Sequence, residues 1–241
     1  MSASQVRVRE VGPRDGLQVE KPLGPAQRVR LLEALVAAGV REMEAVAFVS
    51  PRAVPAMDGA AEVLAAFCAP GVTRWALVPN RRGAEAALAA GADALSVTAS
   101  ASEGYSQRNV RMSVDRAVEE VASVADAAGG RVPIDAVISC AFGSPYEGDI
   151  EPAFVGTLSE RVSAAGATSV TLADTTGMAT PRRLREVLGF TGADVGLHLH
   201  QTRGTALVNA YAALAAGVRR FDTSVGGLGG SPFAAGSAGN L

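Results

Sequence analysis

The chain has 241 residues, a formal net charge of −2 and 48% hydrophobic residues. A chain of this length can bury a large core as one domain, and its weak net charge gives no electrostatic reason to expect a nucleic acid or an anionic membrane as a partner. No apolar run reaches the roughly 18 residues that span a bilayer, and the first residues lack the apolar stretch of a signal peptide.

The number and spacing of the cysteines indicate the redox environment of the protein. The sequence has only Cys68 and Cys140, far apart and without a CxxC pair. This usage is typical of a reduced environment and predicts no disulfide framework, so we expect a cytoplasmic protein.

Hydrophobic patterning in chain order alternates between strands and helices. Short apolar runs predict eight strands, at residues 6–11, 42–49, 73–78, 94–99, 132–142, 169–173, 195–200 and 219–225. Helical spacing predicts seven helices between them, at residues 26–38, 59–67, 83–90, 114–128, 152–165, 181–188 and 205–216. Several of these helices are followed by glycine, a frequent C-terminal cap.

This alternation predicts one α/β domain over residues 1–241 with the TIM (β/α)8 barrel fold. A doubly wound open sheet is the alternative, and it is weaker because no G-x-G-x-x-G follows the first predicted strand. The sequence stops at Gly239-Asn240-Leu241, before a helix that would cover the eighth strand. We therefore expect this chain to lack the final helix and a C-terminal extension.

The only two histidines, His198 and His200, lie two residues apart at the end of a predicted strand. Alternate strand residues share a face at roughly 6–7 Å, so both imidazoles would point to one place, as a pair of metal ligands must. Two unrelated histidines at a strand end are the competing interpretation.

Other polar residues follow or end predicted strands, where the active sites of such barrels lie. These are Arg14, Asp15, Glu44, Asp174, Ser231 and Asn240. Two imidazoles, a carboxylate and an amide oxygen suit a divalent cation such as Mg²⁺, Mn²⁺ or Zn²⁺. Asp15 could instead cap a turn and Asp174 could be a helix N-cap, whereas a buried Glu44 needs a partner such as Arg14.

A metal with an adjacent arginine can polarise substrate oxygens and stabilise an enolate. This combination indicates the making or breaking of a carbon–carbon bond beside a carbonyl.

Several motifs in order along the chain resemble 3-hydroxy-3-methylglutaryl-CoA lyases. They are Val11-Gly12-Pro13-Arg14-Asp15-Gly16-Leu17-Gln18 with Glu20-Lys21, Glu44 ahead of Phe48-Val49-Ser50-Pro51, Ser139 to Gly148, Asp174-Thr175-Thr176-Gly177, the histidine pair, and Ser224 to Gly230 through Gly239-Asn240-Leu241. The resemblance implies a metal-dependent TIM-barrel lyase.

The resemblance also implies roles. Asp15, His198, His200 and Asn240 would hold the divalent cation, with Mg²⁺ or Mn²⁺ expected. Arg14 would stabilise the enolate of acetyl-CoA, Asp174 and Glu44 would serve proton transfer and hold Arg14 and the metal shell in place, and Ser231 stands at a catalytic position. Lys21 is expected to contact the coenzyme A thioester.

The implied reaction is retro-Claisen cleavage of a 3-hydroxy-3-methylglutaryl-CoA-like thioester to acetyl-CoA and a 3-oxo acid, acetoacetate for the usual substrate. A carboligase acting on a 2-oxo acid or another acyl-CoA, and a non-catalytic acyl-CoA-binding barrel, are the alternatives. We expect an acyl-CoA as partner and leave the oligomeric state open, with a homodimer as one candidate.

Three features depart from the family pattern. Ser231 stands where the family carries a cysteine, and a hydroxyl is a much poorer acid or base than a thiol. Gln201-Thr202-Arg203-Gly204 replaces Asp-Thr-Tyr-Gly, which adds two units of positive charge beside the predicted metal site. The C-terminal part of the family pattern is absent. These departures bear on the substrate and on the rate rather than on metal binding.

Overall fold

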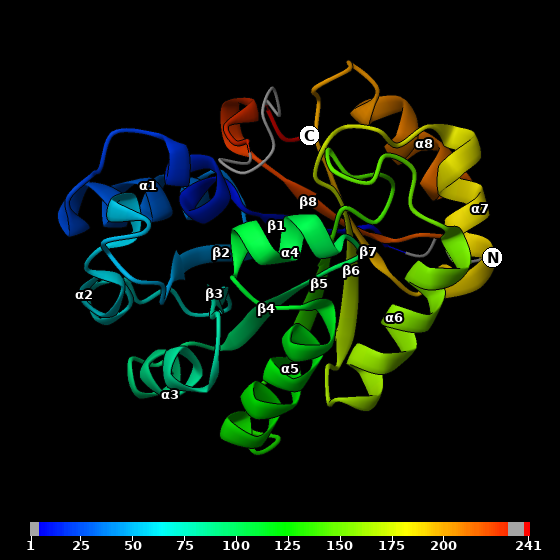
Figure 1. Ribbon diagram of the computed structural model, residues 1–241. Helices are drawn as coiled ribbons and strands as arrows, with labels where there is room; N and C mark the ends of the chain where they lie inside the picture. Colours follow the sequence, from blue (N-terminus) through cyan, green and yellow to red (C-terminus); the bar gives the residue numbers. More distant parts are fainter. Residues whose placement is uncertain (1–4, 231–238) are drawn as a thin grey trace.

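Eight parallel strands form a closed barrel in the computed structural model, which describes residues 5–230 and 239–241 (Figure 1). Each strand pairs with the next along the chain, and the last pairs with the first. The strands are β1 (Arg7–Glu10), β2 (Glu42–Ala47), β3 (Thr73–Leu77), β4 (Ala94–Ser100), β5 (Ile134–Ser139), β6 (Ser169–Asp174), β7 (Gly196–Leu199) and β8 (Arg220–Thr223). The predicted TIM barrel is confirmed.

Helices follow the strands and surround the barrel (Figure 1). They are α1 (Pro25–Ala37), α2 (Ala60–Ala66), α3 (Arg81–Ala89), α4 (Glu103–Asn109), α5 (Val114–Ala128), α6 (Pro152–Ala164), α7 (Pro181–Thr191) and α8 (Ala206–Ala215). Within the described residues, the chain after β8 forms the short 3-10 helix η4 (Val225–Gly227). None of the described helices is long and apolar enough to cross a membrane.

The largest differences from the sequence-based elements lie at two places, while other element ends shift by one to three residues. Helix α4 was not predicted, because its seven residues are mostly polar and too few to show a helical period; Ser102 caps it by accepting from the Tyr105 amide. Strand β5 is shorter than the predicted run at residues 132–142. The chain turns at Cys140, whose φ of +57° is incompatible with a strand.

The main hydrophobic core lies between the strands and the helices. Outward-facing strand residues such as Leu95, Ile138 and Leu197 belong to the same buried cluster as Val121 of α5 and Leu184 of α7. Burying each such side chain contributes about 1.5–3 kcal/mol, so this layer supplies most of the hydrophobic stabilisation.

The interior of the barrel is unusually polar at the N-terminal ends of the strands. Residues from seven of the strands line a cavity of about 390 Å³ there. Barrels of this fold usually fill the interior with branched aliphatic side chains. Here ionic and hydroxyl side chains take that place, and they include Arg9, Asp135, Thr171 and Asp222.

Gly196 allows β6 and β7 to approach closely inside this polar layer, which gives a test of the packing. A Cβ at Gly196 would lie 2.5 Å from Thr171 Oγ1, which donates to Asp135. We expect Gly196→Ala to lower the free energy of unfolding by about 1–3 kcal/mol, measured by urea denaturation.

Gly189 in α7 is the matched control, since a Cβ there meets nothing within 4 Å. Gly189→Ala should raise the free energy of unfolding by about 0.5–1 kcal/mol, because alanine is preferred within a helix. Equal effects of the two substitutions would contradict the close approach at Gly196.

Candidate functional site

Asp15 lies in a tight turn directly after β1, at the C-terminal rim of the barrel. The Val11 carbonyl accepts from the Asp15 amide at 2.7 Å, within the π-helical turn η1 (Gly12–Gly16). The Gly12 amide donates to Glu10 Oε1 at 2.8 Å, and a Cβ at Gly12 would lie 2.5 Å from that oxygen, so the Glu10 side chain would have to move to accommodate one. The turn buries the Asp15 carboxylate rather than leaving it in solvent.

The two histidines reach the same place from β7. Their ring centroids lie 5.0 Å apart, and both rings are buried. His200 Nδ1 lies 3.1 Å from the Asp174 carbonyl oxygen, which only accepts, so in the neutral ring the proton is on Nδ1. The Nε2 atom of His200 is buried without a hydrogen-bond partner. Its lone pair is therefore available to a ligand.

Asp15, His198 and His200 each offer a ligand atom, and these atoms all lie within 4.8 Å of one another. His198 Nε2 lies 3.8 Å from Asp15 Oδ2. Such separations suit three ligands around one cation, and this set corresponds to the predicted arrangement of two histidines and one carboxylate.

Asn240 joins the cluster from the C-terminal segment. It forms an isolated bridge with His200, and its amide donates to Asp15 Oδ2 at 2.8 Å. Its Oδ1 is buried without a hydrogen-bond partner. Gly229 (φ +137°) packs so closely that a Cβ would lie 2.4 Å from Asn240 Nδ2.

Two unpartnered buried atoms, His200 Nε2 and Asn240 Oδ1, are costly to leave unsatisfied in a folded protein. A divalent cation bound between them and Asp15 would satisfy both. The residues therefore fit the metal that the sequence predicts.

The charge states of Asp15 and His200 suit a cation, whereas a protonated His198 must lose its proton to bind one. Burial lowers the pKa of His200 to about 4, with a further contribution from His198, so this ring is neutral near pH 7. Burial alone would raise the pKa of Asp15, but Arg14 and both histidines outweigh it and lower that pKa. For His198 burial acts downward, and the hydrogen bond to Asp222 and the charge of Asp15 raise its pKa overall.

Arg14 is held beside this cluster by two carboxylates. Its Nη1 donates to Asp15 Oδ1 at 2.7 Å, and both Nε and Nη2 contact Glu44 Oε2. Glu44 lies on β2 and is buried, so the partner that its burial requires is present. Each terminal nitrogen of Arg14 carries a second N–H beyond these contacts.

Asp174 ends β6 and completes the group of acidic residues. Its Oδ1 accepts from the Ala179 amide at 2.9 Å, whereas Oδ2 is buried without a partner. Burial raises the pKa of Asp174 to about 6. A carboxyl group of this kind can exchange a proton near neutral pH.

The remaining predicted residues lie outside this cluster. Lys21 is exposed on the loop before α1. Gln201 accepts from the Ala206 amide, and Arg203 is exposed and donates to the Thr176 carbonyl. Ser231 falls outside the described residues, so its predicted role stays a prediction.

Among the buried charged residues that sequence reasoning missed, Arg9, Asp135 and Asp222 form one connected group. Arg9 lies in an alternating strand pattern that also fits a solvent-exposed face. The available signal was Asp135, which interrupts the apolar run of its predicted strand and is unfavourable there unless its charge is paired.

A closed (β/α)8 barrel with buried acidic, arginine and histidine side chains at the C-terminal rim is the architecture of a TIM-barrel enzyme with a candidate metal site. A sequence model of the HMGL-like family matches residues 5–241. The chain therefore belongs to the HMGL-like family, as the sequence motifs predict.

The relatives of this chain are carbon–carbon lyases. A 3-hydroxy-3-isohexenylglutaryl-CoA/hydroxy-methylglutaryl-CoA lyase from Pseudomonas aeruginosa is 43% identical, over 98% of this chain and 82% of its own length. A hydroxymethylglutaryl-CoA lyase from Pseudomonas mevalonii is 42% identical, over 98% and 81%. The solved HMG-CoA lyase of Acinetobacter baumannii, in complex with coenzyme A and 3-methylmalate, has a TM-score of 0.94 and 36% identity, and covers 100% of this chain and 82% of its own. The predicted enzyme class is confirmed.

The cluster predicts that divalent cations stabilise the fold. At a Mn²⁺ concentration of 100 times Kd, the free energy of unfolding should rise by about 2.7 kcal/mol, which raises Tm by about 5–10 °C. His200→Ala should abolish this rise in a thermal melt, and excess EDTA should reverse it in the unchanged protein.

Asp93→Asn is the matched control, because Asp93 pairs with Arg74 away from the cluster. Its own Tm should fall, but its response to Mn²⁺ should equal that of the unchanged protein. Stabilisation of His200→Ala by Mn²⁺ would place the cation elsewhere.

Proposed function

We propose that this protein is a divalent-metal-dependent lyase that cleaves a 3-hydroxy-3-methylglutaryl-CoA-like thioester to acetyl-CoA and a 3-oxo acid. The observation that carries the proposal is the convergence of Asp15, His198, His200 and Asn240 on one point beside Arg14, in a chain of the HMGL-like family. Two unpartnered buried ligand atoms at that point support a bound cation.

Asp15, His198, His200 and Asn240 would hold the cation, with Mg²⁺ or Mn²⁺ favoured for a site that also binds substrate oxygens. When bound, the metal supplies Lewis acidity that polarises the substrate oxygens.

The cleavage breaks one carbon–carbon bond and needs two proton transfers. The tertiary hydroxyl loses its proton, its oxygen forms the new carbonyl of the 3-oxo acid, and the adjacent carbon–carbon bond breaks. That electron pair becomes the enolate of acetyl-CoA, which takes a proton on carbon to give the thioester product. The protein therefore needs a proton acceptor at the hydroxyl, a stabiliser for the enolate oxygen and a proton donor at carbon.

Arg14 is suited to the enolate oxygen. Asp15 and Glu44 fix its guanidinium, and a second N–H on each terminal nitrogen remains for the thioester oxygen. A donor fixed before the reaction stabilises charge that develops in the transition state without reorganisation.

Asp174 is suited to proton transfer, because its buried carboxyl has a raised pKa and one free oxygen. We assign it to the substrate hydroxyl, with Glu44 holding Arg14 in place.

The coenzyme A portion is expected at the same rim. The structure of the Acinetobacter baumannii lyase is a complex with coenzyme A, and it aligns with the whole of this chain. Lys21 lies exposed after β1, where an ammonium can meet the coenzyme's phosphates, and we retain it as a coenzyme contact.

The related thioester substrates differ in their acyl group. One relative is named for both the methyl and the isohexenyl substrate. Arg203 is exposed next to the histidines and could bind an additional anionic group on the substrate.

The test is the formation of acetyl-CoA from 3-hydroxy-3-methylglutaryl-CoA with Mg²⁺ or Mn²⁺, compared with the isohexenyl thioester. We expect cleavage that EDTA abolishes, and a loss of about 10²–10³ in kcat for Arg14→Met, because one oxyanion donor is worth that much. Arg81→Met on α3 is the control, since Arg81 pairs with Glu85 and both side chains are exposed.

Absence of acetyl-CoA from either thioester with every metal, together with thermal stabilisation by the acyl-CoA, would favour the non-catalytic barrel instead. Cleavage at an unchanged rate by Arg14→Met would contradict the assigned role of Arg14 alone.

Ser231 gives an independent prediction. A thiol exchanges its proton near neutral pH far more readily than a hydroxyl, so Ser231→Cys should raise kcat if proton transfer at this position limits the rate. Steady-state kinetics on the same thioester measure this, and Ser224→Cys, at the start of the same glycine-rich segment, serves as the control. A kcat of Ser231→Cys below that of the unchanged protein would contradict the prediction that Ser231 limits the rate.

A further inference from the structure

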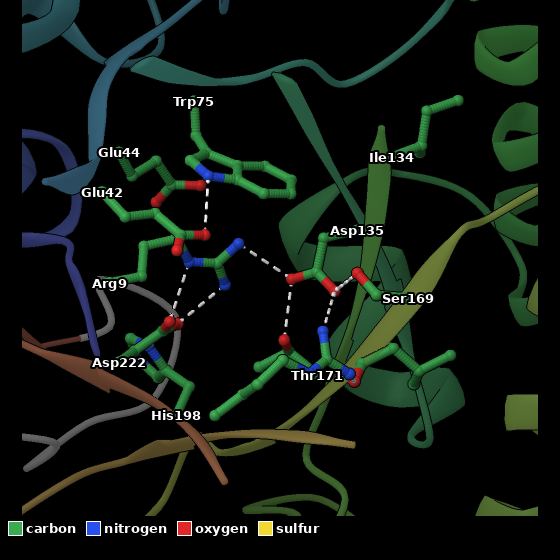
Figure 2. A network of polar contacts seen from close by, with 12 residues as sticks. Arg9, Glu42, Glu44, Trp75, Ile134, Asp135, Ser169, Thr171, His198 and Asp222 are labelled. Atoms are coloured by element: carbon green, nitrogen blue, oxygen red, sulfur yellow. Dashed lines mark hydrogen bonds and ion pairs between the residues drawn. The ribbon is translucent and has the colours of Figure 1, made fainter. Parts of the chain in front are cut away.

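A buried arginine and a buried aspartate face each other across the first and last strands. Arg9 on β1 and Asp222 on β8 are register partners, and both side chains are buried. Arg9 Nε donates to Asp222 Oδ1 at 2.8 Å and Nη2 donates to Oδ2 at 3.0 Å (Figure 2). This bidentate contact fixes the plane of the carboxylate.

The same carboxylate contacts a predicted metal ligand. Asp222 Oδ2, the oxygen that also accepts from Arg9 Nη2, lies 3.1 Å from His198 Nδ1, and Figure 2 shows His198 beside Asp222. The contact is direct because β7 and β8 are neighbours in the barrel. A continuous series of side-chain contacts therefore leads from Arg9 through Asp222 to His198, one of the predicted metal ligands.

Arg9 is itself prevented from rotating. Its Nη1 contacts Asp135 Oδ2 at 2.9 Å, and its guanidinium carbon lies 5.0 Å from the centre of the Trp75 ring (Figure 2). Asp135 in turn accepts from the hydroxyls of Ser169 and Thr171, each at 2.7 Å. The carboxylate that faces His198 is therefore anchored by a rigid network in the interior of the barrel.

We propose that Asp222, oriented by Arg9, is a positioning residue that holds His198 in the tautomer protonated on Nδ1, with Nε2 directed at the cation site. A neutral imidazole has one N–H, and a carboxylate offers only acceptors, so the proton lies on the nitrogen that faces Asp222. The other nitrogen, Nε2, is the atom 3.8 Å from Asp15 Oδ2. Partners of this kind fix the ring orientation of metal ligands.

The inference rests on the proposed function only for the identity of the cation site. The tautomer of His198 can be measured without metal or substrate. His200 is an internal reference, because its Nδ1 faces the backbone carbonyl of Asp174 and has no contact with Asp222 in the described structure.

Asp222→Asn tests the proposal. Oδ2 faces both Arg9 Nη2 and His198 Nδ1, and Oδ1 faces Arg9 Nε, so the new NH2 meets one arginine donor in either orientation. Placed at the Oδ2 position, it donates to His198 Nδ1 and moves the imidazole proton to Nε2. The chain has two histidines, so ¹⁵N-histidine NMR at alkaline pH reports two neutral rings. We expect the Nδ1–H form for both rings in the unchanged protein, and the Nε2–H form for His198 alone in Asp222→Asn.

Mn²⁺ affinity is the second readout, measured by the EPR signal of free Mn²⁺. Proton occupancy of Nε2 should raise the dissociation constant of Asp222→Asn about 10–100-fold, the usual effect of losing such a partner. Asp135→Asn is the matched control, because Asp135 is equally buried and binds the same Arg9 but does not touch His198. It should keep both the tautomer and the Mn²⁺ dissociation constant of the unchanged protein.

The outcomes separate this inference from the proposed function. A His198 ring protonated on Nε2 in the unchanged protein, or a Mn²⁺ dissociation constant that stays unchanged in both Asp222→Asn and Arg9→Lys, overturns the inference and leaves the lyase proposal in place. A changed tautomer and weakened Mn²⁺ binding support the inference even if no thioester is cleaved.

Arg9→Lys provides the test if Asp222→Asn does not fold. The ammonium group of lysine keeps the positive charge but cannot reproduce the bidentate contact with Asp222. Its Mn²⁺ dissociation constant should still rise, by less than that of Asp222→Asn, and an unchanged value contradicts the proposal.

Discussion

Closure of eight parallel strands is the constraint on which the candidate site depends. Because every strand runs in the same direction, the segments that follow β1, β6 and β7 emerge at a single rim. Asp15 and His198 are separated by most of the chain, yet their ligand atoms lie 3.8 Å apart. The strands supply this proximity through backbone hydrogen bonds, so the loops need only small adjustments, such as the turn around Gly12 and the return of Asn240 to His200.

The interior of the barrel gives this site an ionic support. Two carboxylates flank Arg9, and one of them also contacts His198. Burying charges is costly unless each is paired and hydrogen-bonded, and here the hydroxyls of Ser169 and Thr171 satisfy the second carboxylate. A network that is fully satisfied is rigid, whereas an aliphatic interior would pack well but could not orient an imidazole.

Sequence patterns predicted the elements well where the periodicity was long, and less well where a single backbone conformation decided. Helix α5 agrees with its prediction residue for residue, because its 15 residues carry a clear apolar stripe. The end of β5 was misplaced, because the left-handed conformation of Cys140 leaves no trace in hydrophobicity. The pairing of Glu44 with Arg14 was predictable, since a buried carboxylate requires a partner.

The sequence by itself determined the barrel, the family and the residues with the chemistry of the site. Strand and helix periods are local properties, and motifs such as the one around Arg14 and Asp15 are contiguous. Only the tertiary structure decided which groups meet. The contact of Arg9 with Asp222, and of Asp222 with His198, depends on β8 pairing with both β1 and β7. That pairing joins the two ends of the chain, and no local pattern encodes it because it arises only when the barrel closes.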